Sequence, residues 1–386
     1  AIIDCSEAIR LNPQLAKAYA NRGVAKEKKG DYEGAITDLS EAIRFNPQDA
    51  EVYANRGVAK EKKGDYEGAI IDCSEAIRLN PQLAKAYANR GVAKEKKGDY
   101  EGAITDLSEA IRFNPQDAEV YANRGVAKEK KGDYEGAIID CSEAIRLNPQ
   151  LANAYENRGV AKEKKGDYEG AITDLSEAIR LNPQLANAYA NRGIAKGHKR
   201  DYDGSITDLS EAIRLNPQLA NAYANRALTK EKKGNYEGAI TDYSEAIRLN
   251  PQSAEIYTNR GNAKFYRGDY EGAIADYNES LRFNPQFKMS IKNKGVVYYK
   301  LGKMDDAIKE YEAYLQQEAD PQVLQRFSEL LLNRMVERYR KKELSLAKED
   351  MLKFQKYASS YHPKRPQVEK MLQKIEEELK QQTEKK

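Results

Sequence analysis

Nine asparagines that recur every 34 residues are the polar side chains whose type and spacing most favour a binding function. A carboxamide has two N–H donors and a carbonyl acceptor, so it can pair with a peptide group on both sides. A row of such groups could hold an extended polypeptide by its backbone, with little demand on the sequence that it binds. The alternative is that each amide bonds to a neighbouring helix and fixes the repeat spacing. The nine are Asn21, Asn55, Asn89, Asn123, Asn157, Asn191, Asn225, Asn259 and Asn293.

Patterns typical of catalysis are missing from the sequence. It holds neither a Gly-x-x-x-x-Gly-Lys-Ser/Thr phosphate loop nor a Gly-x-Ser-x-Gly nucleophile elbow. Repeated carboxylates such as Asp31 and Glu33 suit the start of a helix better than an acid–base pair. The sequence contains only three cysteines and two histidines, so we expect neither a zinc site nor a disulfide framework. We therefore predict no enzymatic activity, no cofactor and no metal.

Charge and hydropathy narrow the choice of partners. Lys and Arg total 64 against 61 Asp and Glu, so the net charge of +3 lacks the one-signed field that nucleic acids or anionic membranes require. No apolar run approaches the roughly 18 residues of a membrane-spanning helix. Each cysteine precedes Ser-Glu-Ala-Ile-Arg, which favours a core side chain copied by duplication over redox chemistry. Free thiols fit a cytoplasmic location, but an N-terminal signal stays open because the chain starts inside a repeat.

A 34-residue period organises most of the chain, and a period of this size predicts a solenoid. In residues 16–49, apolar and small residues at helical spacing predict a first helix that ends at Gly30. Asp31 is the expected N-cap of a second helix, which stops at Pro47. Each unit is therefore expected to be a pair of antiparallel helices.

These residues resemble the tetratricopeptide repeat, whose signature combines an aromatic residue, small residues, Gly-Asp-Tyr and a closing proline. The residues that carry the resemblance are Tyr19, Gly23, Gly30, Asp31, Tyr32, Ala35, Leu39, Ala42 and Pro47. The resemblance implies an all-α, right-handed α–α superhelix with the first helices on its concave face.

The period also predicts the organisation of the chain. Residues 1–15 correspond to the second helix of a truncated repeat, and 16–287 to eight repeats of 34 residues. Residues 288–321 are a degenerate ninth repeat. The period is lost from about residue 322, so we expect 322–386 to form a helical C-terminal cap and tail that cover the last apolar face.

If the helices stack in this way, the asparagines form a row over a floor of small residues, with a charged rim. The residues expected on the floor and rim are Ala20, Val24, Glu27, Lys28, Ala54, Val58, Ala88 and Val92. The row resembles the asparagine ladder in the superhelical repeats of O-linked N-acetylglucosamine transferases, which grips substrate polypeptides. Nothing in the chain resembles the catalytic part of those enzymes.

Two charged patterns also recur with the period. An arginine follows each asparagine, and an aspartate occupies the second helix of the same unit, which predicts an ion pair within or between units. In the ninth unit both change together, to Lys294 and Glu310. The repeated Lys-Glu-Lys-Lys segments are interpreted as solvated helix ends. Arg200 occupies the left-handed glycine position of its unit, at a cost of roughly 1 kcal/mol.

The resulting functional hypothesis is a non-enzymatic scaffold that captures an extended or helical protein segment in its concave groove. One alternative is a structural element that self-associates end to end through the open N-terminal half-repeat. Another is the recruitment arm of an enzyme whose catalytic domain lies outside this chain. Neither nucleic-acid binding nor membrane insertion is expected.

Overall fold

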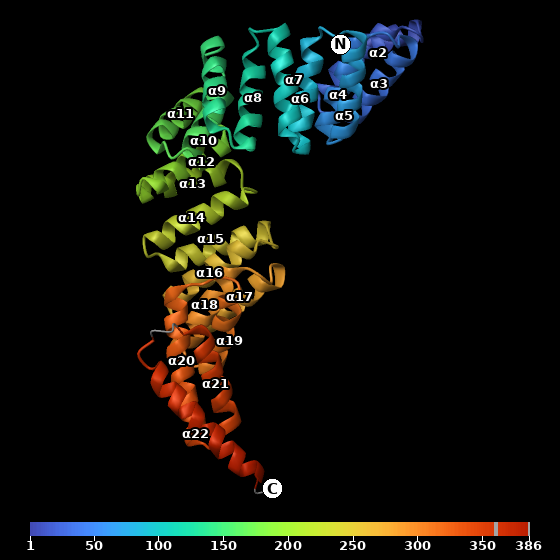
Figure 1. Cartoon of the computed structure of the whole chain (residues 1–386). Coiled ribbons are helices and arrows are strands. Elements are labelled where there is room, and N and C mark those ends of the chain that lie inside the picture. Colours follow the sequence, from blue (N-terminus) through green and yellow to red (C-terminus); the bar gives the residue numbers. More distant parts are fainter. Residues whose placement is uncertain (359–361, 385–386) are drawn as a thin grey trace. The chain divides into compact units, whose positions relative to one another are not determined.

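The computed structural model describes residues 1–358 and 362–384, and the regular elements in these residues are all α-helices. Residues Ala1–Leu215 and Asn216–Lys386 form two compact units (Figure 1). The helices of the first unit are α1 (Ile2–Leu11), α2 (Ala16–Glu27), α3 (Tyr32–Phe45), α4 (Ala50–Lys63), α5 (Tyr66–Leu79), α6 (Ala84–Lys97), α7 (Tyr100–Phe113), α8 (Ala118–Lys131), α9 (Tyr134–Leu147), α10 (Ala152–Lys164), α11 (Tyr168–Leu181), α12 (Ala186–His198) and α13 (Tyr202–Leu215). The helices of the second unit are α14 (Ala220–Lys232), α15 (Tyr236–Leu249), α16 (Ala254–Arg267), α17 (Tyr270–Phe283), α18 (Lys288–Lys300), α19 (Met304–Leu315), α20 (Pro321–Arg340), α21 (Leu344–Tyr357) and α22 (Arg365–Glu384).

The boundaries between paired helices follow from local chemistry. Gly98 ends the α6 helix with a φ of +85°, a conformation that costs glycine little. The carboxylate of Asp99 then accepts a hydrogen bond from the Gly102 N–H at 2.9 Å and caps α7. On α7, Ala103 and Leu107 are fully buried, at the spacing that places side chains on one helical face. The prediction of an all-α array of consecutive helix pairs is confirmed.

Arg200 shows how the fold tolerates a departure from this scheme. It has a φ of +65° at the position where the preceding unit carries Gly166, whose φ is +85°. Because a Cβ is disfavoured there, we expect Arg200→Gly to stabilise the protein by about 1 kcal/mol. The reverse change, Gly166→Arg, should destabilise it by a similar amount. Urea denaturation of both variants checks this; an unchanged or lower midpoint for Arg200→Gly would contradict it.

The second unit contains a helix pair beyond the part of the chain in which the sequence shows the period. In α20 and α21, Arg334 donates to Asp350 through Nε at 3.1 Å and through Nη2 at 2.6 Å. This arginine and aspartate are 16 residues apart, as they are in each repeat. Lys342 has a φ of +64°, eight residues after the arginine, where a repeat carries its left-handed glycine. The repeat geometry therefore continues after residue 321, where we expected only a cap.

Larger core side chains explain why the sequence pattern fails in α20 and α21. Met335 occupies the place of the tight glycine of a repeat, and Phe354 that of a buried alanine. Both are buried in a cluster that also contains Phe327, Leu331 and Met351. The small-residue signature disappears because large side chains fill the space between these two helices, so their backbones do not need to approach closely.

Candidate functional site

The asparagine row lines a series of cavities between successive first helices. Asn21 and Asn55 line a cavity of about 500 Å³ at α2 and α4, and Asn89 and Asn123 line one of about 280 Å³ at α6 and α8. Asn123 and Asn157 share a third, of about 540 Å³. Consecutive members of the row thus face common spaces that are open to solvent.

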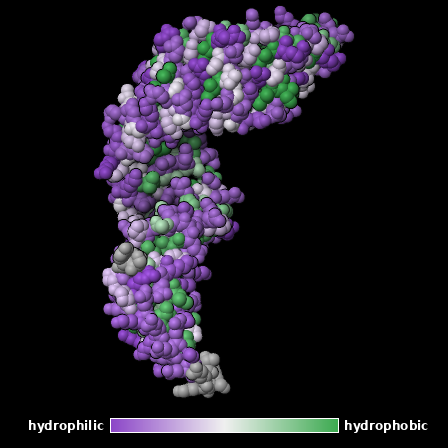
Figure 2. All heavy atoms as spheres, in the orientation of Figure 1, coloured by the Kyte–Doolittle hydropathy of each residue, from purple (hydrophilic) through white to green (hydrophobic). Residues whose placement is uncertain are grey.

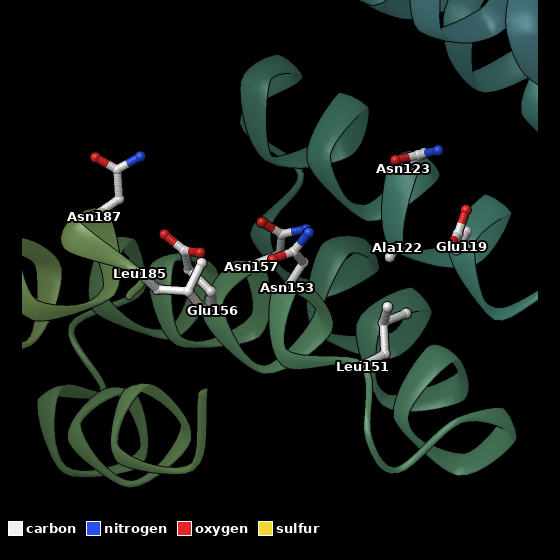
Figure 3. A pocket seen from close by; sticks show the side chains of 9 residues that line it. All are labelled: Glu119, Ala122, Asn123, Leu151, Asn153, Glu156, Asn157, Leu185 and Asn187. Atoms are coloured by element: carbon white, nitrogen blue, oxygen red, sulfur yellow. The ribbon is translucent and has the colours of Figure 1, made fainter. Parts of the chain in front are cut away.

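Figure 3 shows the cavity that Asn123 and Asn157 share. Asn123 comes from α8 and Asn187 from α12, and between them Asn153 and Asn157 lie next to each other on α10. Glu156 lies beside them and replaces the alanine found at Ala20 and Ala88. Burial raises the pKa of the Glu156 carboxyl. This cavity therefore offers several carboxamides and one poorly solvated carboxylate.

Five amides of the row make no side-chain hydrogen bond to any described residue. The others are partly engaged within the protein, which the sequence did not reveal. Asn89 donates to the Ala54 carbonyl at 3.4 Å, and Asn293 donates to Oδ1 of Asn262 at 2.7 Å. Asn55 accepts from Lys85 at 2.7 Å, and Asn225 donates to the Asn221 carbonyl at 2.8 Å. The five are Asn21, Asn123, Asn157, Asn191 and Asn259.

The residues predicted for the floor lie in two different environments. Ala20 and Val24 line the cavity between α2 and α4, and Ala88 and Val92 line the one between α6 and α8. Ala54, however, has no exposed surface. It packs against Ala76 and Ala86 in the core, so its assignment to the groove floor is wrong. Val58 is half-buried.

The predicted rim is only partly exposed. Lys28 is exposed, whereas Glu27 is half-buried. At the same position in later units, the side chains of Glu95 and Glu163 expose 14% and 13% of their surface, and each lies 3.4 Å from the next lysine. The glutamates therefore form part of the packed helix surface, and the second lysine of each segment forms the outer edge.

A buried charge network positions the first helices, and so the row. Each repeat arginine pairs with the aspartate of its own unit at 2.7–2.8 Å, which decides between the two predicted arrangements. In α8, Arg124 also donates through Nη1 to Ser108 on the preceding second helix at 3.0 Å. Three helices are thereby held by one guanidinium. The changed pair of the ninth unit, Lys294 and Glu310, is retained at 2.9 Å.

The Lys-Glu-Lys-Lys segments are not simply solvated helix ends, as the sequence suggested. Their first lysine, such as Lys128, lies 2.8 Å from the same buried aspartate and is only 19% exposed. Their last lysine pairs with a glutamate of the preceding unit, as Lys131 does with Glu101 at 2.5 Å. The first lysine thus joins the buried network and the last one links neighbouring units, so these segments contribute to repeat stacking.

Two of the three cysteines lie in the core, and the third, Cys5, is half-buried. Cys73 and Cys141 have no exposed surface, and burial raises the pKa of each thiol to about 12. Their thiolates are therefore absent near neutral pH, which supports the interpretation as core side chains. Within the described residues, no three His, Cys, Asp or Glu side chains are grouped so that they could hold a metal. None of the described helices is long and apolar enough to cross a membrane.

Comparison with known families identifies the repeats. The TPR repeat model matches four segments and tetratricopeptide repeat models match four more. The matched segments are 28–64, 96–132, 163–197 and 231–265 for the former, and 50–83, 118–151, 254–287 and 293–321 for the latter. The chain belongs to the tetratricopeptide repeat family. As a tetratricopeptide repeat protein it has the architecture of a scaffold for protein interactions.

Two solved structures, with TM-scores of 0.52 and 0.50, agree on the fold of this tetratricopeptide repeat protein. A tetratricopeptide repeat protein from Parabacteroides merdae has a TM-score of 0.52 at 19% identity, over 64% of this chain and 98% of that one. The human IFIT1 dimer with m7Gppp-AAAA has a TM-score of 0.50 at 15% identity, over 79% and 90%. MamA from Desulfovibrio magneticus has 25% identity and a TM-score of 0.40, over 44% and 96%. Comparison with the curated proteins finds no match.

Proposed function

We propose that this protein is a non-enzymatic scaffold that binds an extended polypeptide segment along the asparagine row. The observation that carries the proposal is that Asn123 and Asn157 line one open cavity, and that neither side-chain amide has a hydrogen bond to the described part of the chain. Their donors and acceptors remain available for a peptide backbone. The repeat arginines and aspartates are already committed to the arginine–aspartate–lysine network. The polar groups left for a ligand in this cavity are therefore the amides and the carboxylates of Glu119 and Glu156.

The proposal gives each segment of the chain a role. Residues 16–287 would supply the groove and 288–321 its degenerate end, with 1–15 and 322–386 covering the flanks. The partner would be a protein or peptide segment. A cytoplasmic location stays a prediction.

The test replaces Asn89, Asn123 and Asn157 with alanine together. Because each lost hydrogen bond is worth about 0.5–1.5 kcal/mol, we expect the three changes to weaken binding about tenfold or more. The probe is a fluorescein-labelled 16-residue peptide of Gly, Ser and Ala, with binding followed by fluorescence anisotropy. A peptide N-methylated at alternate residues should bind weakly to the wild-type protein, because it lacks backbone donors.

The matched control is Thr105→Ala combined with Thr173→Ala, two exposed positions on second helices. It should bind the peptide as the wild-type protein does. Unchanged peptide affinity in the asparagine variant, at an unchanged melting temperature, would remove the ladder hypothesis.

Self-association is the alternative that one observation favours. Ile3 and Leu11 on α1 are 82% and 71% exposed, an apolar surface that a second copy could cover. Light scattering over a range of concentrations separates the two functions, since end-to-end association should be lost when both residues are replaced with serine.

A further inference from the structure

A cavity of about 370 Å³ in the second unit differs in chemistry from those of the first. It is lined by residues of α14, α16, α17 and α18, most of them at positions equivalent to the floor and rim of the other cavities. Phe265 and Tyr266 stand where most repeats carry the glutamate and second lysine of their Lys-Glu-Lys-Lys segments. The rim of this cavity is therefore aromatic, whereas the rim of the other cavities is charged.

Its apolar side chains are unusually exposed. Tyr266 is 61% exposed and Met289 is 53% exposed, and both line the cavity. Tyr266 is held in place by Tyr236, with ring centroids 5.5 Å apart, and by an edge contact with Phe265 at 5.4 Å. An ordered aromatic ring beside a flexible methionine is typical of a surface that receives another side chain.

Glu231 is the one charged residue that lines this cavity. Its counterparts Glu95 and Glu163 each lie 3.4 Å from the next lysine, but within the described residues Glu231 has no ion pair. Instead it accepts a hydrogen bond from the Tyr243 hydroxyl at 3.2 Å. Burial raises the pKa of its carboxyl, and the hydrogen bond from Tyr243 and the charge of the adjacent Lys232 offset this only in part.

The nearby cations are already paired. Lys264 lies 2.8 Å from Asp276, and Arg267 lies 2.5 Å from Glu237. The two asparagine side chains that line the cavity are also held in place. Oδ1 of Asn262 accepts hydrogen bonds from the Tyr277 hydroxyl at 2.8 Å and from the Asn293 amide at 2.7 Å. Lys232 acts on Glu231 only from beyond ion-pair distance, so within the described residues the carboxylate keeps room for a cation of a ligand.

We propose that this cavity receives a lysine or arginine side chain of the segment bound along the asparagine row, an inference that rests on the proposed function. The cation would pair with Glu231 and lie against the faces of Phe265 and Tyr266. Its aliphatic stem would contact Met289. The near-identical repeats of the first unit give little preference for one sequence over another, and this cavity would add a preference for a basic residue.

The test uses the full chain labelled with ¹³C at its methionine methyl groups, so that Met289 reports on this cavity alone. Its signal is assigned from the variant Met289→Leu. The probes are two labelled 12-residue Gly–Ser peptides, one with a central lysine and one with norleucine, which has no charge. We expect the lysine peptide to shift the Met289 signal and to bind at least tenfold more tightly than the norleucine peptide.

Two variants locate the preference. Glu231→Gln keeps the shape of the side chain and should abolish the preference for lysine, and Tyr266→Lys, which restores the usual repeat residue, should do the same. The matched control is Glu163→Gln, since Glu163 occupies the same repeat position but has lysine and histidine neighbours. It should leave the preference unchanged.

The outcomes separate the two proposals. Equal binding of both peptides, or binding that leaves Met289 unperturbed, overturns this inference and leaves the scaffold function standing. If neither peptide binds at all, both proposals fail.

Discussion

Replacing Asp140 with leucine, or Arg124 with methionine, is expected to destabilise the protein by about 3 kcal/mol, more than any other change considered for this chain. Asp140 is 2% exposed and accepts from Arg124 Nε and Nη2, both at 2.8 Å. Each single change leaves a buried or half-buried charge without its main partner. Changing both should cost less than the sum of the two single changes, because Arg124 and Asp140 are then removed together and only Lys128 loses its partner.

Urea denaturation and amide exchange of α8 and α9 together measure this cycle, since a repeat array need not unfold in one step. The control is Arg146→Met, which breaks an exposed pair with Glu143 at 2.6 Å on the same α9 helix. That change should cost less than about 1 kcal/mol. If the costs of the Arg124 and Asp140 changes simply add, the network does not act as a unit.

Gly125→Ala is expected to destabilise the protein by about 2 kcal/mol, although alanine is the better helix former. A Cβ at this position would lie 2.7 Å from Cys141 Sγ and 3.3 Å from the Ala137 carbonyl oxygen. Cys141 is fully buried, so its sulfur cannot turn away without meeting other core atoms. The close approach of α8 and α9 therefore requires glycine.

The same contact suggests a rescue. Cys141→Ala removes the sulfur, so the double variant Gly125→Ala/Cys141→Ala should be more stable than the sum of the two single changes predicts. Denaturation midpoints of the three variants provide the measurement. Strict additivity would mean that the backbone, not the sulfur, limits the approach of the two helices.

Local features of the fold were predictable because they depend on residues close together in the chain. The left-handed glycines, such as Gly98, and the capping aspartates, such as Asp99, occur where the repeat pattern places them. The ion pair of Arg124 with Asp140 was also predicted, although the sequence could not decide between pairing within a unit and pairing between units. The distance between the two residues along the chain does not say which neighbouring helix lies nearer to the arginine.

The candidate site was less predictable, because it depends on how successive helices stack. The row of asparagines was evident from the period, but not the bond of Asn89 to the Ala54 carbonyl. Ala20 and Ala54 have the same place in their repeats, yet only Ala20 lines a cavity. The following first helix brings Val52 to the cluster of Ala20 but the smaller Ala86 to that of Ala54, so the two alanines are covered differently.

By itself, the amino-acid sequence determined that this chain repeats a pair of helices, where most of those helices end, and which polar groups recur on each. Only the tertiary structure decided which of those groups are used internally. It showed that Lys128 joins a buried network, that Arg334 and Asp350 continue the repeat geometry, and that five amides of the row stay unbonded in the described chain. The physical reason is that helix ends depend on neighbours along the chain, whereas burial and pairing depend on contacts between helices.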